Sequence, residues 1–148
     1  MRAIYANPGL SLEQEGAFEL VELDTPEATG HDLLVDIEAV SVNPIDTKLR
    51  QALTDESRVL GWDAAGVVEA VGEQVTLFQP GDLVYYAGDI KRPGSNAQFQ
   101  LVDERIAGHC PRKLSFSQAA AMPLTTITAW ESLFDRMKIQ PERDSGKT

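Results

Sequence analysis

Residues Leu60–Gly72 read LGWDAAGVVEAVG, and the pair Gly81-Asp82 follows a short step later. This stretch contains three glycines among small and β-branched residues. Glycine lacks a Cβ, so a strand that contains it can bend sharply or pass close to another backbone. The composition therefore predicts strands that lie unusually close to a neighbouring segment of the chain.

Alternating apolar and polar residues predict further short strands on both sides of this stretch. The clearest is His31–Val42, in which Leu33, Val35 and Ile37 share one face and acidic residues dominate the other. Asn43-Pro44 ends this strand, and Ile45–Leu53 predicts one or two helical turns. Turn-forming residues separate the other expected strands, at residues 1–7, 18–23, 61–70, 83–86 and 97–102.

The character of the sequence changes near residue 115. Ser115, with Gln118 three residues later, predicts a capped helix start, and Pro123 interrupts that helix. Thr125–Lys138 then predicts a longer amphipathic helix. Short strands followed by helices predict a mainly β fold with C-terminal helices, of the α+β class. Among such folds we favour a Greek-key partial barrel.

Composition excludes several classes of function. The 148 residues carry a formal net charge of -10, and no basic face is visible, so we expect no nucleic-acid partner. No apolar run approaches the ~20 residues of a membrane-spanning helix, so we expect no membrane association. The N-terminus does not resemble a secretory signal, which makes the cytoplasm the expected compartment. One cysteine and two histidines are too few for a closed structural zinc site.

Three segments together resemble a known family. Val40–Arg50 is similar to the Asn-Pro-x-Asp-x-x-x-Arg motif of NAD(P)H quinone oxidoreductases, which belong to the medium-chain dehydrogenase/reductase superfamily. Leu60–Gly72 with Gly81-Asp82 resembles the glycine signature of that superfamily. Leu114–Trp130 resembles the link that leads into the cofactor domain of its members.

The resemblance implies a GroES-like catalytic domain over residues 1–114 and a helical connector over residues 115–148. The connector would lead to a Rossmann domain, whose glycine-rich phosphate turn is not found in this sequence. Residues 145–148 look like the approach to its first strand. We therefore expect a truncated N-terminal domain that is inactive alone. NADP or NAD would be bound mainly by the missing domain.

Zinc-dependent relatives carry a cysteine near the position of Asn43 and a Gly-His-Glu run at Gly61–Asp63. Asparagine is a poor zinc ligand and tryptophan cannot be one, so we expect no metal and no zinc. The resemblance places Asn43, Asp46 and Thr128 among the catalytic residues. It also places Asn43 and Thr128 near the nicotinamide, and Lys48 is a candidate for an anionic substrate or the phosphate end of the cofactor.

Each of these residues also has an ordinary structural explanation. Asn43 before Pro44 suits a turn, Thr128 suits a helix in which it bonds a backbone carbonyl, and Lys48 suits solvent. Asp46 and Arg50, four residues apart, suit an ion pair on one helix face.

Trp62 and Asp63 are the predicted substrate pocket. Trp62 would provide an aromatic wall for a flat ring. The alternatives are core packing for Trp62 and a turn or ion pair for Asp63.

The resemblance thus predicts the substrate side of a reductase that transfers a hydride from a nicotinamide to a small quinone or enone. Two alternatives stay open: a zinc alcohol dehydrogenase relative with degenerate ligands, and a stand-alone binding or oligomerisation module. We also expect a homo-oligomer, formed through an edge strand or through the apolar helix face of Ile127, Trp130, Leu133 and Phe134.

Overall fold

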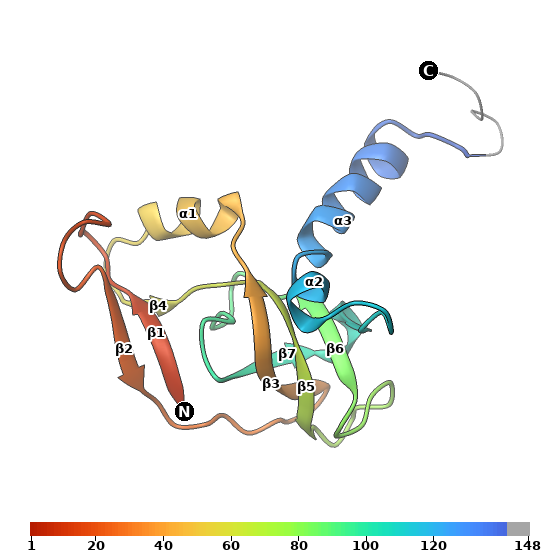
Figure 1. Ribbon diagram of the computed structural model, residues 1–148, viewed down its shortest axis with the longest axis horizontal. Helices are drawn as coiled ribbons and strands as arrows, with labels where there is room; N and C mark the ends of the chain where they lie inside the picture. The colour runs from red at the N-terminus through yellow and green to blue at the C-terminus, as the bar shows by residue number, and fades with distance from the viewer. Residues whose placement is uncertain (142–148) are drawn as a thin grey trace.

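The computed structural model describes residues 1–141, and the predicted approach to a Rossmann strand at residues 145–148 lies outside them. Two sheets make up the body, with strand orders β2-β1-β4 and β7-β3-β5-β6-β8, and their described strand pairs are antiparallel (Figure 1). The mainly β fold is therefore confirmed. The strands are β1 Arg2–Ala6, β2 Phe18–Glu22, β3 Asp32–Ser41, β4 Arg58–Val59, β5 Asp63–Val71, β6 Leu83–Ala87, β7 Phe99–Asp103 and β8 Ala107–His109.

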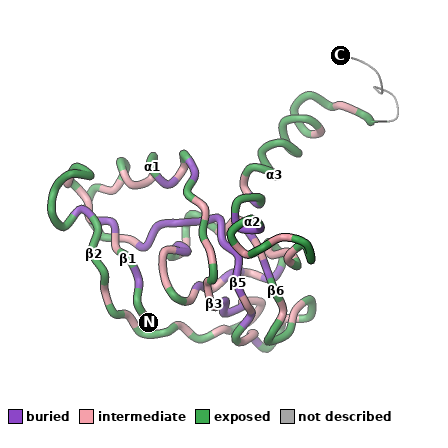
Figure 2. Tube along the Cα trace, in the orientation of Figure 1, coloured by how far each residue is buried: buried purple, intermediate pink, exposed green. Residues whose placement is uncertain are grey.

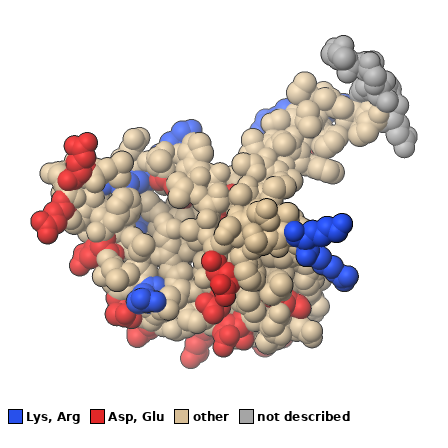
Figure 3. All heavy atoms as spheres, in the orientation of Figure 1, with Lys and Arg blue, Asp and Glu red and all other residues tan. Residues whose placement is uncertain are grey.

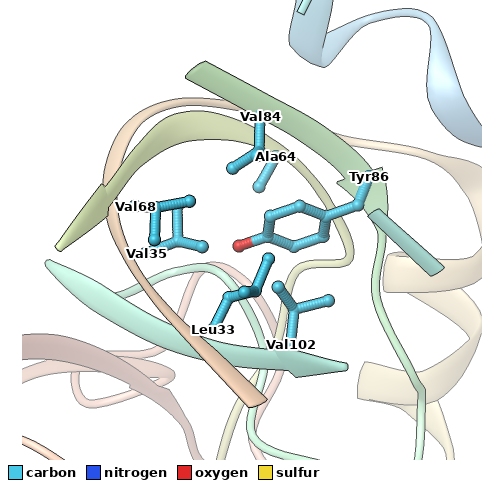
Figure 4. Close-up of a cluster of buried hydrophobic side chains, with 7 residues drawn as sticks. All are labelled: Leu33, Val35, Ala64, Val68, Val84, Tyr86 and Val102. Atoms are coloured by element: carbon cyan, nitrogen blue, oxygen red, sulfur yellow. The ribbon is translucent and has the colours of Figure 1, made fainter. Parts of the chain in front are cut away.

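The core lies against the five-stranded sheet, with Tyr86 among aliphatic side chains (Figure 4). Its phenol is buried, and the hydroxyl donates to Oε1 of Gln100 at 2.9 Å. The predicted alternation in β3 holds for Leu33 and Val35, but Leu34 is buried as well, and the register of β3 against β5 shifts between Leu34 and Val35. The buried cluster comprises Leu33, Val35, Ala64, Val68, Val84, Tyr86 and Val102.

Gly66 of β5 pairs with Ile37 of β3, where the two backbones leave no room for a side chain. A Cβ at this position would lie 2.0 Å from the carbonyl oxygen of Asp36. Gly72, at the end of the same stretch, would place a Cβ 2.4 Å from the carbonyl oxygen of Gly30. The close backbone approach predicted from the glycines of residues 60–72 is therefore confirmed, and it sets the spacing of the central strands.

One helix, α1 Pro44–Gln51, follows β3, and a group of helices that begins with α2 Phe116–Ala120 follows the last strand. Ser115 caps α2 as predicted, since its Oγ accepts from the backbone N–H of Gln118 at 3.4 Å and Oε1 of Gln118 accepts from the Ser115 N–H at 3.0 Å. Ala119 and Ala120 of α2 pack on Ala65 of β5, so the predicted connector begins on the sheet. The helices are α1 Pro44–Gln51, the 3₁₀ turn η1 Glu104–Ile106, α2 Phe116–Ala120, α3 Pro123–Trp130 and the π-helical turn η2 Glu131–Arg136.

The last helix differs from the prediction of a regular helix over residues 125–138. It begins two residues earlier, because Pro123 occupies the first helical position, where its missing N–H would have had no partner. From Glu131 it continues as a π-helix. Figure 1 shows α3 leaving the body of the molecule, and Figure 2 shows it almost entirely exposed.

The surface carries few basic groups for its many acidic ones. Acidic side chains are spread over the face of the sheets in Figure 3, in line with the net charge of -10. Apolar side chains are exposed on the projecting helix. Trp130 is 62% exposed, and its ring centroid lies 4.5 Å from that of Phe134. Oligomerisation through this face stays a prediction. Within residues 1–141, no helix is long and apolar enough to cross a membrane.

We expect Gly66→Ala to lower the free energy of unfolding by about 3 kcal/mol or more, because the added Cβ forces β3 and β5 apart. Gly9→Ala is the control: Gly9 has a φ of 73° but nothing within 4 Å of an added Cβ, so backbone strain alone should cost about 1 kcal/mol. Urea unfolding measures both. Equal losses in the two variants would contradict the close approach.

Candidate functional site

Asp63, the first residue of β5, joins three parts of the chain. Its side chain is 0% exposed, and each carboxylate oxygen accepts a hydrogen bond. Oδ2 accepts from Nδ2 of Asn43 at 2.9 Å. Oδ1 accepts from the backbone N–H of Leu124 at 2.9 Å. The end of β3, the start of β5 and the first turn of α3 therefore meet at one carboxylate.

Local sequence explains why Asn43 lies beside Asp63. Ser41 pairs with Asp63 in the β3–β5 ladder, and the chain then turns out of the sheet into α1. Asn43 is extended, and Pro44 begins the helix, where proline is favoured. Oδ2 of Asp46 accepts from the backbone N–H of Asn43 at 2.7 Å. Asn43 is thus held by two carboxylates, Asp46 at its backbone and Asp63 at its side chain.

Burial dominates the electrostatics of this group. It raises the pKa of Asp63 above the ordinary aspartate value, because the charged form loses water. The hydrogen bonds from Asn43 and Leu124 lower the pKa, and the negative charge of Asp46 raises it. Taken together, these effects raise the pKa of Asp63. The two hydrogen bonds are what favour its ionised form.

The carboxylate also fixes the orientation of the Asn43 amide. An ionised carboxylate only accepts hydrogen bonds, so the Asn43 atom that faces Asp63 must be the donor Nδ2. Oδ1 then lies on the other side of the carboxamide. The part of Asn43 that is directed away from the carboxylate is an acceptor.

The structure brings Asn43, Asp46 and Asp63 together, while the other predicted site residues lie farther out. Thr128 is exposed on α3, and its Oγ1 donates to the carbonyl of Leu124 at 2.8 Å, the backbone bond named as its ordinary explanation. Lys48 is exposed on α1. Within residues 1–141, neither side chain forms a hydrogen bond with Asp63, whose oxygens accept from Asn43 and Leu124.

The ion pair expected between Asp46 and Arg50 is wrong. Asp46 accepts from the backbone of Asn43 instead. The guanidinium of Arg50 donates to the carbonyl of Leu10 at 2.8 Å and lies 5.2 Å from the ring centre of Phe18. Capping the helix start satisfies a buried N–H, which a half-exposed ion pair would leave without a partner.

Trp62 belongs to the core. Its side chain is 2% exposed and packs with Ala6 and Leu60, with partly buried side chains of α1 and the following loop around it. This agrees with the core-packing alternative. Its role as a pocket wall stays an untested prediction.

Sequence analysis missed Leu124, which contributes a backbone group rather than a side chain. The available signal was Pro123. A proline at the first helical position marks a helix start, and the N–H groups of the first turn need acceptors outside the helix. In this fold the buried carboxylate of Asp63 accepts the Leu124 N–H.

Two surface hollows lie apart from this group. One, of about 350 Å³, lies between Ile4 of β1 and Val40 of β3. Another, of about 720 Å³, lies beside Cys110 and Phe116. Neither is lined by the predicted site residues.

Asn43, Trp62 and Asp63, the residues that the resemblance aligns with zinc ligands, do not fit zinc. Trp62 has no ligand atom, the Nδ2 of Asn43 is a donor, and both oxygens of Asp63 already accept hydrogen bonds. Among residues 1–141, no group of three or more His, Cys, Asp or Glu side chains is arranged to hold a metal ion. This donor set therefore offers zinc no tetrahedral site.

Comparison with known proteins places these observations in context. The sequence model of the alcohol dehydrogenase GroES-like domain matches residues 29–129. A zinc-type alcohol dehydrogenase-like protein of Staphylococcus epidermidis is 43% identical over 151 residues, covering 100% of this chain and 45% of that protein. A 2-methylene-furan-3-one reductase of Solanum lycopersicum is 37% identical over 135 residues, covering 80% of this chain and 34% of the reductase. The chain thus spans less than half the length of these relatives.

Solved structures agree with the fold. An alcohol dehydrogenase superfamily protein from Novosphingobium aromaticivorans has a TM-score of 0.85 and 36% identity, covering 95% of this chain and 43% of that one. The quinone oxidoreductase of Escherichia coli complexed with NADPH has a TM-score of 0.78 and 26% identity, covering 95% of this chain and 42% of that one.

If Trp62 is a core residue, Trp62→Ala should lower the free energy of unfolding by about 3–5 kcal/mol, because it leaves a large cavity. The matched control is Trp130→Ala on the exposed helix, which should cost less than about 1 kcal/mol. Denaturant unfolding measures both variants. A loss at Trp62 no larger than the loss at Trp130 would show that Trp62 is not packed in the core.

Proposed function

The chain belongs to the alcohol dehydrogenase GroES-like domain family, and from this premise we propose that it forms the substrate side of an NAD(P)H-dependent reductase. The reductase would transfer a hydride to a quinone or an enone without zinc. One observation carries the proposal: Asn43 and Asp63, which the resemblance aligns with metal ligands of zinc-dependent relatives, are an amide and a carboxylate hydrogen-bonded to each other at 2.9 Å.

The relatives support this reaction class. The tomato relative is named for a ring ketone conjugated to a methylene group, which is an enone, and the bacterial quinone oxidoreductase was solved with NADPH. The staphylococcal relative carries a zinc-type name, but the donor set around Asp63 in this chain does not fit the metal. We therefore favour hydride transfer to a conjugated carbonyl over zinc-dependent alcohol oxidation.

Without a metal, a conjugated carbonyl substrate must be held in a fixed geometry against the hydride donor. In our proposal Asp63 holds Nδ2 of Asn43 and Asp46 holds its backbone, so the carboxamide is fixed before any ligand arrives. Its Oδ1 would accept a hydrogen bond from the nicotinamide or ribose side of the cofactor. A fixed acceptor of this kind limits the positions that a flat ligand can take.

NADPH or NADH, when bound, would supply the hydride, and the remainder of a longer protein would provide most of its binding site. From this chain we propose Asn43 as the principal contact. Thr128, on the exposed face of α3, and Lys48, on α1, are secondary candidates toward the same ligand. Residues 1–114 would form the catalytic domain, and residues 115–148 the connector.

A chimera tests the proposed function. We would replace the matching N-terminal segment of the staphylococcal relative with this chain and follow the oxidation of NADPH with 1,4-benzoquinone and with an enone. We expect turnover by the chimera and none by the 148-residue chain alone. Asn43→Ala in the chimera should lower kcat/KM by about 100-fold, because the cofactor loses the fixed acceptor that positions it for hydride transfer.

The matched control is Gln51→Ala, which removes an exposed amide from the same helix and should leave kcat/KM unchanged. Turnover with an alcohol and NAD⁺ but with neither acceptor would contradict the proposed reaction. Turnover by the 148-residue chain alone would contradict the need for a second domain.

Zinc content is a separate prediction. Elemental analysis of the purified chain, after dialysis against buffer with equimolar zinc, should find well under one zinc per chain, because the donors around Asp63 form no tetrahedral set. Stoichiometric zinc that is lost on Asp63→Asn substitution would overturn the zinc-free assignment.

A further inference from the structure

We propose that Asp63 is a positioning residue that couples the first turn of α3 to the carboxamide of Asn43, so that helix and amide reorient together. The inference rests on the proposed function only for the role of Asn43. The coupling itself belongs to the fold and can be measured without turnover.

The first step of the coupling is that two donors share one buried carboxylate. Two donors from different segments, Nδ2 of Asn43 and the N–H of Leu124, each bind one oxygen of Asp63 at 2.9 Å. Asp63 is 0% exposed, so solvent water cannot directly replace either donor. When one donor leaves, the rigid carboxylate must rotate or shift to recover a partner, and this rotation moves the oxygen that holds the other donor.

The attachment of α3 carries the second step. Pro123 is buried and Leu124 is half-buried, but the rest of the helix from Thr125 to Trp130 is exposed. The helix therefore contacts the body at its first turn and projects from it (Figures 1 and 2). A change in its direction acts directly on the Leu124 N–H, and so on Asp63.

Thr128 adds a third link. Its hydroxyl donates to the carbonyl of Leu124 at 2.8 Å, on the same helical turn whose N–H binds Asp63. Two of the predicted cofactor contacts, Asn43 and Thr128, are thus connected through Asp63 and Leu124. A ligand that pulls on α3 would change both contacts at once.

The charged surroundings of Asp63 make the coupling measurable in the unmodified protein. Asp46 of α1 is the titratable group that faces it. The helix α3, Pro123–Trp130, carries no titratable side chain, and the strand neighbours Ser41 and Ala87 are uncharged. Protonation of Asp63 turns one carboxylate oxygen into a hydroxyl donor and leaves the other as a weaker acceptor, so the hydrogen bonds from Asn43 and Leu124 both change.

The test is a pH titration of the ¹⁵N-labelled 148-residue chain by NMR. We expect the Leu124 amide signal and the Asn43 side-chain amide signal to shift with one common midpoint, above the ordinary aspartate pKa. Asp46→Asn removes the like charge and should lower that midpoint for both signals together. Separate midpoints, or a shift in one signal alone, would overturn the coupling.

A second arm uses Asp63→Asn, which has the same size but only one acceptor oxygen, so it can serve one donor. Exchange of the Leu124 amide with solvent should accelerate at least tenfold, and the Asn43 side-chain signal should move. Thr125→Val is the matched control, because it removes a hydroxyl that bonds only within the helix region and should change exchange less than twofold.

If Asp63→Asn does not fold, the titration of the unmodified chain still decides. Turnover by the chimera together with separate titration midpoints would reject the coupling and keep the proposed function. A common midpoint with an inactive chimera would keep the coupling and reject the function.

Discussion

Asp63 has no contact with solvent, and each of its oxygens accepts one hydrogen bond from a different segment of the chain. A buried carboxylate is costly unless such donors are present, and these donors come from the end of β3 and the start of α3. Folding therefore has to bring both segments to the first residue of β5. The position and orientation of Asn43, and the attachment of the projecting helix, depend on this one group.

The close spacing of β3 and β5 places Asp63 beside the residues that donate to it. At Gly66 the backbones of β3 and β5 leave no room for a side chain, and the ladder between them continues to the pair Ser41 and Asp63. Small residues at Ala64 and Ala65 let the core and α2 pack on opposite sides of the same strand. The stretch at residues 60–72 thus determines both the sheet and the location of its polar end.

Much of the fold could be predicted from the sequence because its signals are local. Alternation predicts β3, and the serine with glutamine three residues later predicts the start of α2. The site was harder, because its decisive contacts join residues far apart in the chain. The bond from Asn43 to Asp63 and the burial of Trp62 depend on packing between segments. The pairing of Asp46 with Asn43 rather than Arg50 is a local helix-capping contact, which the spacing of the two residues could have indicated. Leu124 contributes only its N–H, which no side-chain pattern reveals.

The central claim is that one carboxylate accepts both hydrogen bonds, and NMR can detect such a bond directly. A long-range experiment records scalar coupling across a hydrogen bond, here between the Leu124 amide nitrogen and the Asp63 carboxyl carbon. The account predicts a cross-peak between these two nuclei at neutral pH. A protected Leu124 amide whose cross-peak leads to any other carbonyl carbon would contradict it.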